Sequence, residues 1–222
     1  MSPRAALAVL FAIPLVAGPA VPAAAAEHTE PGPQILTDAI AAMSRASNFH
    51  VTGHSAVGGS QVSVNLSMSL NGGGGTIEAN GATLQVVVAH KATAYIKADE
   101  HSWVILTHDP SAAQKLANQW IQLPASTPGI SNFVELTVSS TFIHLILPGS
   151  YVPSTTKAGM GHWDGRTAVV LTNAFNEQLY IADNGTPYLL HLQAAVTSAG
   201  WFNFTDFGTA PMPSVPTYFI SA

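Results

Sequence analysis

The chain has 222 residues and a net charge of −5, and only 9% of its residues are charged. An ordinary soluble domain contains about 25% charged residues, so uncharged polar side chains supply much of the polarity here. The few lysines and arginines form no basic patch, which argues against nucleic-acid binding. The absence of cysteine excludes disulfides, thiolate metal ligands and a cysteine nucleophile.

Residues 1–26 have the pattern of a secretory signal peptide. Arg4 gives a positive start, residues 5–16 form the apolar middle, and residues 24–26 are a small-residue cleavage site. The alternative is an uncleaved membrane anchor. It is less favoured because prolines interrupt the apolar segment, while a membrane span needs ~20 residues. We therefore expect a secreted or cell-envelope protein.

The remaining chain is expected to form a single domain. Residues 15–18 resemble the start of a bacterial lipoprotein box, but Pro19 occupies the position of the lipid-bearing cysteine, so no lipid anchor is expected. Residues 27–33 are a polar, proline-containing leader that we expect to be flexible. The domain itself is predicted over residues 34–210, followed by a proline-rich tail over residues 211–222.

The central pattern is strict alternation over residues 61–70, which predicts a strand with one apolar and one polar face. The apolar face carries Val62, Val64, Leu66, Met68 and Leu70. The Asn-Gly run over residues 71–75 predicts a chain reversal into a partner strand, because glycine tolerates positive φ angles.

Further elements follow from periodicity and turn signals. Helices are predicted over residues 34–47, 111–118 and 130–147. Strands or extended segments are predicted over residues 48–56, 76–79, 83–90, 93–98, 102–106, 155–162, 167–172, 178–182, 188–196 and 201–207. We therefore expect an α+β fold, with one curved antiparallel sheet and helices packed on its concave face.

The order of several short motifs resembles the mycobacterial LppX/LprG-type lipoprotein family, which is similar in fold to the LolA and LolB carriers. The motifs are Tyr-Ile-Lys at 95–97, Asn-Gln-Trp-Ile-Gln-Leu-Pro at 118–124, Trp-Asp-Gly-Arg at 163–166, Leu-Tyr-Ile-Ala at 179–182 and Phe-Thr-Asp-Phe-Gly at 204–208. The resemblance implies a strongly curved, incompletely closed half-barrel whose apolar cavity holds acyl chains. It also implies a role in moving lipids or lipidated molecules across the envelope, without catalytic residues or cofactors.

The partners that follow from this resemblance are a lipid or lipidated ligand and an envelope transporter or acceptor protein, with transient membrane contact. The cavity-wall candidates are Val62, Val64, Leu66, Met68, Leu70, Leu84, Val86, Val88 and Ile96 on strands, and Phe133, Phe142 and Ile143 on the helix over residues 130–147. Each has an alternative interpretation as ordinary core, in which the helical residues only seal the sheet. Burial of acyl chains suits such a wall because each buried CH₂ contributes ~0.8 kcal/mol without a directional partner.

Other functions have weaker support in the sequence. His50 and His54 would lie about 13 Å apart on a strand at ~3.3 Å per residue, too far for one metal ion. No Gly-x-Ser-x-Gly nucleophile turn is present, so a hydrolase is not favoured. The main alternative to a lipid carrier is an extracytoplasmic protein-interaction or sensor module built on the same fold.

Overall fold

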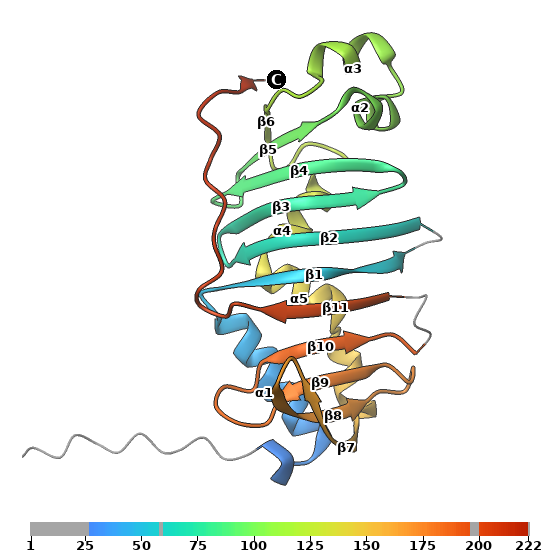
Figure 1. The fold of residues 1–222 in the computed structure, drawn as a ribbon, viewed down its shortest axis with the longest axis vertical. Helices are drawn as coiled ribbons and strands as arrows, with labels where there is room; N and C mark the ends of the chain where they lie inside the picture. Colours follow the sequence, from blue (N-terminus) through green and yellow to red (C-terminus); the bar gives the residue numbers. More distant parts are fainter. Residues whose placement is uncertain (1–26, 58–59, 196–199, 222) are drawn as a thin grey trace, which may run out of the picture.

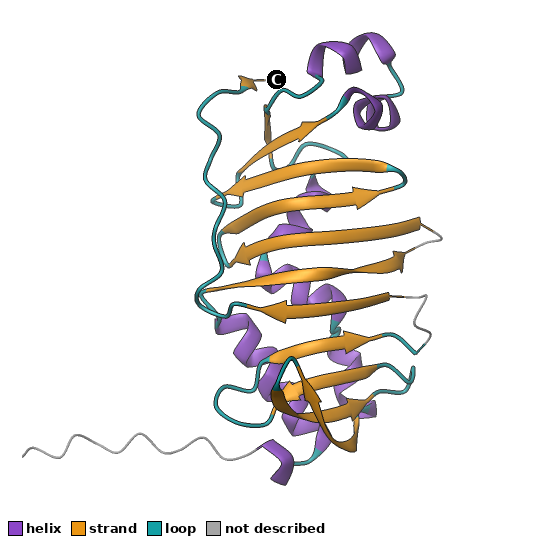
Figure 2. Ribbon diagram, viewed as in Figure 1, coloured by secondary structure: helices purple, strands orange, loops and turns teal. Residues whose placement is uncertain are grey.

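The computed structural model describes residues 27–57, 60–195 and 200–221, so the expected signal peptide lies outside the described residues. Within these ranges, twelve strands form one sheet, and helices cover one of its faces (Figure 1). Figure 2 shows this division into a strand layer and a helix layer. The sheet order runs from β12 at one edge to β7 at the other, and these edges do not pair with each other. The predicted α+β fold with an incompletely closed sheet is confirmed.

The elements have the following bounds. The strands are β1 Asn48–Val57, β2 Ser60–Ser69, β3 Gly72–Ala79, β4 Ala82–Ala89, β5 Thr93–Ala98, β6 Ile121–Pro124, β7 Thr156–Trp163, β8 Arg166–Thr172, β9 Gln178–Ala182, β10 Leu189–Gln193, β11 Gly200–Thr205 and β12 Ile220–Ser221. The helices are α1 Gly32–Arg45, α2 Glu100–Thr107, α3 Pro110–Leu116, α4 Ser131–Thr137 and α5 Ser139–Ile146, with 3-10 turns η1 Glu27–Thr29 and η2 Gly149–Ser154.

The sheet joins two halves of the chain at β1. The order is β12-β6-β5-β4-β3-β2-β1-β11-β10-β9-β8-β7, so β1 pairs with β2 on one side and with the late strand β11 on the other. Neighbouring strands are antiparallel, except that β12 runs parallel to β6. The chain passes between the two halves through α4 and α5, which therefore lie across the middle of the sheet (Figure 1).

The alternation predicted for residues 61–70 is present in β2. Val64, Leu66 and Met68 are buried, and they face Gly53, Val51 and Phe49 across the β1 ladder. The apolar stripe of α1 packs onto the same core through the fully buried side chains of Ile35, Leu36 and Met43. The core thus lies between the concave face of the sheet and the helices.

The glycine run has a different role from the predicted one. The β2–β3 turn is at residues 70–71, and the run over residues 72–75 belongs to β3. A Cβ on Gly73 would lie 2.3 Å from the Ser67 carbonyl oxygen and 3.0 Å from that of Thr137. Gly73 is therefore required where the backbones of β2 and of the α4–α5 junction approach β3 closely.

The predicted helix over residues 130–147 is two helices. Val138 between them is extended, with φ −95° and ψ 116°, and it forms a parallel bridge with Ser69 at the end of β2. Valine has low helix propensity, so a break at this position costs little local energy. The break lets α4 and α5 follow the curved sheet as separate segments.

The predicted edge strand over residues 102–106 is wrong, because this segment lies in helix α2. The Asp99 side chain accepts a hydrogen bond from the Ser102 backbone N–H at 2.7 Å, which caps the helix start. The capping residue outweighs the β-branched and aromatic side chains that follow it.

The C-terminal residues return along the ends of the strands (Figure 1). The Pro213 ring lies 3.0 Å from the position that a Gly74 Cβ would take, and the Phe219 ring contacts Tyr95 at 5.3 Å between centroids. Strand β12 then pairs with β6, so the last described residues lie against the sheet.

Candidate functional site

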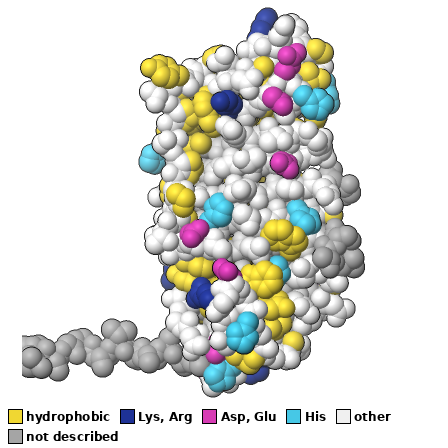
Figure 3. All heavy atoms as spheres, in the orientation of Figure 1, with side chains coloured by type: hydrophobic (Ala, Val, Ile, Leu, Met, Phe, Trp, Pro, Cys, Tyr) yellow, Lys and Arg dark blue, Asp and Glu magenta, His cyan; other side chains and the backbone are white. Residues whose placement is uncertain are grey.

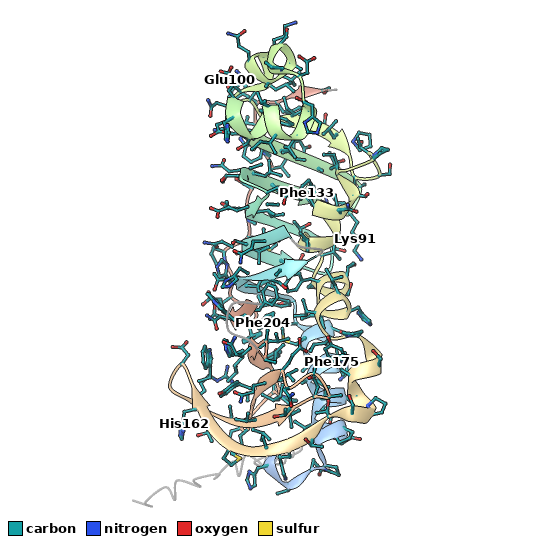
Figure 4. All side chains as sticks on the ribbon, turned by 90° about the vertical axis from the view of Figure 1, so that its right-hand side faces the viewer. Lys91, Glu100, Phe133, His162, Phe175 and Phe204 are labelled. Carbon is teal, nitrogen blue, oxygen red and sulfur yellow. The ribbon has the colours of Figure 1, made fainter. Side chains whose placement is uncertain are left out.

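A partly open cavity of about 650 Å³ lies between the sheet and the helix pair α4–α5. The sheet side is formed mainly by Val62, Val64, Leu192 and Phe202. The helix side is formed mainly by Phe133, Leu136, Phe142 and Ile146. Figure 4 labels Phe133 on the helix side of the molecule and Phe204 on the sheet. A volume in the range of ~300–1,000 Å³ with a largely apolar lining is typical of a small-molecule site.

The strand register explains why this space is not filled by side chains. Gly200, Ser55, Val62 and Ala79 lie side by side across β11, β1, β2 and β3. Three of these four side chains are small, so the row contributes little volume above the sheet. The cavity is therefore present because three residues in this cross-strand row have small side chains or none.

The neighbouring rows of the sheet carry larger side chains. The next row places Phe202 beside Gly53 and Val64, and the row beyond it contains Phe204 and Leu66. Phe142 of α5 packs against both phenylalanines, with centroid distances of 5.5 Å to Phe202 and 6.4 Å to Phe204. These aromatic contacts close the inner end of the cavity.

The candidate residues from the sequence divide between cavity wall and core. Val62, Val64, Phe133 and Phe142 line the cavity. A second group is buried in the core outside the cavity lining: Leu66, Met68, Leu84, Val86, Val88, Ile96 and Ile143. Leu70 is 38% exposed beside the β2–β3 turn. One part of the apolar face thus lines the cavity and another part lies in the core, and ligand binding by the lining residues stays a prediction.

Sequence reasoning missed much of the wall. Leu192 and Phe202 come from strands that were predicted but not assigned to the cavity, and Leu136, Leu145 and Ile146 come from the predicted helix. The alternation of Trp201, Phe202, Asn203 and Phe204 was a usable signal for β11. The pairing of β11 with β1, which brings Phe202 to the cavity, has no local signal.

The polar part of the cavity lining consists mainly of carboxylate and amide side chains. It contains Glu135, Glu177, Asn80 and Asn132, together with Tyr151 of η2. Asn173 Nδ2 donates a hydrogen bond to Glu177 Oε2 at 2.6 Å. Burial, followed by the charge of Glu177 and a hydrogen bond to it, raises the pKa of Tyr151. The phenol therefore stays neutral at physiological pH.

The opposite face of the sheet carries a second feature, an outer aromatic cluster formed by Trp163, Tyr180, His191 and Trp201. The Trp163 and His191 rings stack with centroids 3.6 Å apart, and Tyr180 meets His191 at 5.5 Å. Burial lowers the pKa of His191, so its ring is neutral near pH 7. Figure 3 shows hydrophobic and histidine side chains gathered over the lower half of this face.

Two further chemical features can be assessed for the described residues only. Within them, no three His, Asp or Glu side chains are grouped closely enough to hold a metal ion. His50 contacts Ser67 at 3.1 Å, whereas His54 packs on Trp201. Among the described helices, none is long and apolar enough to cross a membrane.

Neither family models nor curated protein sequences match the chain. Solved structures do match. LprF from Mycobacterium bovis is 13% identical, with a TM-score of 0.53 over 82% of this chain and 96% of LprF. The Mycobacterium tuberculosis lipoprotein LppX is 13% identical, with a TM-score of 0.45 over 78% of this chain and 91% of LppX. The Pseudomonas aeruginosa MucA/MucB complex gives 17% identity and a TM-score of 0.35, over 82% of this chain and 58% of the matched chain. The predicted resemblance is thus confirmed at the level of the fold: this chain has the fold of the LppX/LprG-type lipoproteins.

Proposed function

We propose that this protein binds a lipid or lipidated molecule outside the cytoplasm and holds its acyl chain between the sheet and the α4–α5 pair. The observation that carries the proposal is the partly open cavity of about 650 Å³ with its mainly apolar wall. A cavity of this kind can accept a flexible hydrocarbon chain without directional contacts. The fold shared with LprF is consistent with this use of the concave face.

The expected affinity follows from the area that an acyl chain would bury. About 12 methylene groups at ~0.8 kcal/mol each give roughly 10 kcal/mol of gross stabilisation. Association and ordering cost several kcal/mol, with estimates of ~4–15 kcal/mol. The net affinity should therefore be micromolar or weaker for a single chain, and tighter when more of the ligand is buried. Such reversible binding suits a carrier better than permanent storage.

The first experiment is purification of the protein followed by lipid extraction and mass spectrometry. We expect a co-purifying lipid or lipidated molecule, and an uncharged fluorescent acyl probe should bind the delipidated protein. A protein that carries no extractable lipid and binds no probe would contradict the proposal.

A plugged variant connects binding to this cavity. Val62 is half-buried and lines the cavity, so Val62→Trp should obstruct part of it and weaken probe binding about tenfold. Ser63 is the next residue on β2 and points to the opposite face, so Ser63→Trp is the matched control. Equal probe binding by the two variants would show that the acyl chain binds elsewhere.

The transfer role belongs to the same proposal. The expected signal peptide and the missing lipobox cysteine favour an exported protein that moves between a membrane and an acceptor protein. We expect it to accelerate exchange of the fluorescent acyl probe between donor and acceptor vesicles. Exchange at the uncatalysed rate, despite probe binding, would limit the role to binding.

The outer aromatic cluster favours a second candidate function, the binding of a protein partner on the convex face. Trp163, Tyr180 and Trp201 are each partly exposed, although neighbouring rings pack against them. Partly exposed aromatic side chains are enriched at protein interfaces. A partner that co-purifies with the wild-type protein but not with Trp201→Ser, and is unaffected by added lipid, would support this candidate.

A further inference from the structure

The charges around the cavity are all of one sign. Two carboxylates, Glu135 and Glu177, belong to its lining. The remaining polar lining residues are neutral, and no lysine, arginine or histidine of the described chain takes part. A ligand that places its polar end near these residues therefore meets negative charge without a compensating cation.

Glu177 is held in a fixed position at this site. Asn173 Nδ2 donates a hydrogen bond to its Oε2 at 2.6 Å. The Asn173 side-chain oxygen in turn accepts the backbone N–H groups of Phe175 and Glu177, at 2.9 Å and 3.1 Å. The Asn173 side chain is neutral, so it orients the carboxylate without cancelling its charge.

Glu135 supplies the second charge from helix α4. Its side chain is exposed, which places it toward the open side of the cavity. Among the described residues, the ion pair formed by a carboxylate is that of Asp183 with His28, and it includes neither Glu135 nor Glu177. Neither Glu135 nor Glu177 is therefore neutralised by a neighbour in this part of the molecule.

We propose that this cavity selects acyl ligands by the charge of their polar end, with a cationic end preferred over a neutral end and an anionic end bound most weakly. This inference rests on the lipid-binding function proposed above. Two unit charges at contact distance interact appreciably even where solvent partly screens them. We expect about a tenfold difference in affinity between a cationic and an anionic ligand with the same chain. A surface attraction of this type weakens as salt increases.

The test uses three amphiphiles with one identical saturated chain, below their micelle concentrations. Their polar ends are a trimethylammonium group, a glycerol ester and a carboxylate, and each displaces the uncharged fluorescent acyl probe. We expect the ammonium compound to displace the probe at about a tenfold lower concentration than the carboxylate, with the glycerol ester between them. Raising the salt concentration should reduce the difference between the concentrations at which the three amphiphiles displace the probe.

Charge-removing variants assign the effect to the two glutamates. Glu177→Gln and Glu135→Gln should each reduce the ammonium preference about threefold, measured as the ratio between the displacing concentrations of the carboxylate and the ammonium compound. Glu78→Gln is the matched control, because Glu78 is an exposed residue of β3 outside the cavity lining and its loss changes the net charge equally.

The outcomes separate this inference from the proposed function. Equal displacement by the three amphiphiles, or an equal effect of Glu78→Gln and Glu135→Gln, would overturn charge selection while leaving acyl binding intact. Failure of the uncharged probe to bind would contradict the proposed function itself, and the charge preference with it.

Discussion

Replacement of Gly73 by alanine tests how closely the helix layer approaches the sheet. The added Cβ would lie 2.3 Å from the Ser67 carbonyl oxygen, 2.7 Å from the Met68 Cα and 3.0 Å from the Thr137 carbonyl oxygen. All three atoms belong to the backbone, so no side-chain rotation can relieve the contacts. Overpacking against mobile side chains costs typically ~1–3 kcal/mol. We therefore expect Gly73→Ala to lower the free energy of unfolding by about 3 kcal/mol or more.

The assay is thermal and urea unfolding followed by circular dichroism. A loss of about 3 kcal/mol corresponds to a fall in Tm of roughly 6–12 °C for a domain of this size. Gly149→Ala is the control, because a Cβ on Gly149 meets nothing within 4 Å and should leave stability nearly unchanged. The reasoning is refuted if the two variants unfold at the same midpoint.

Three further changes probe the core, a helix cap and a buried histidine. Phe142→Ala removes the edge contact with Phe202 at 5.5 Å and should cost about 3–5 kcal/mol in urea unfolding; a loss below about 1 kcal/mol would contradict the core role. Asp109→Ala removes the side-chain acceptor for two N–H groups at the start of α3, so a loss of about 1 kcal/mol is expected, and an unchanged midpoint would argue against the cap. Burial lowers the pKa of His191, so the unfolded state takes up its proton more readily and stability should fall as the pH drops below the ordinary value of 6.5. His191→Gln should remove this fall of the urea midpoint at low pH. A variant whose urea midpoint still falls in the same way would show that other groups cause the pH dependence.

The strand pattern was accessible from the sequence because it depends on local alternation. Residues 61–70 show a polar and an apolar face without reference to any other segment, and β2 covers nearly the same range. The glycine run was harder, because glycine serves both turns and close backbone contacts. The backbone of β2 and the Thr137 carbonyl oxygen, more than sixty residues away, together show that Gly73 is needed for close contact rather than for reversal.

The error at α2 has a local cause and was avoidable. Trp103, Val104 and Ile105 favour a strand by side-chain type. Asp99, however, stands three residues before Ser102 and caps its N–H, and Glu100 follows at the first helical position. These are helix-start signals, and they decide the structure of a short segment at the edge of a sheet.

The cavity itself depends on long-range register, which is why sequence reasoning found only part of its wall. Gly200 lies far along the chain from Ser55 and Ala79, and it joins their row beside Ser55 only after β11 pairs with β1. The next two rows include the larger side chains of Phe202, Ile77, Phe204 and Leu66 beside smaller ones, so the sheet can support dense packing close to the cavity. The row of small residues lacks the dispersion contacts that larger side chains would make there. Because a single larger residue in this row would recover those contacts, the presence of small residues on three strands agrees with the proposed ligand site.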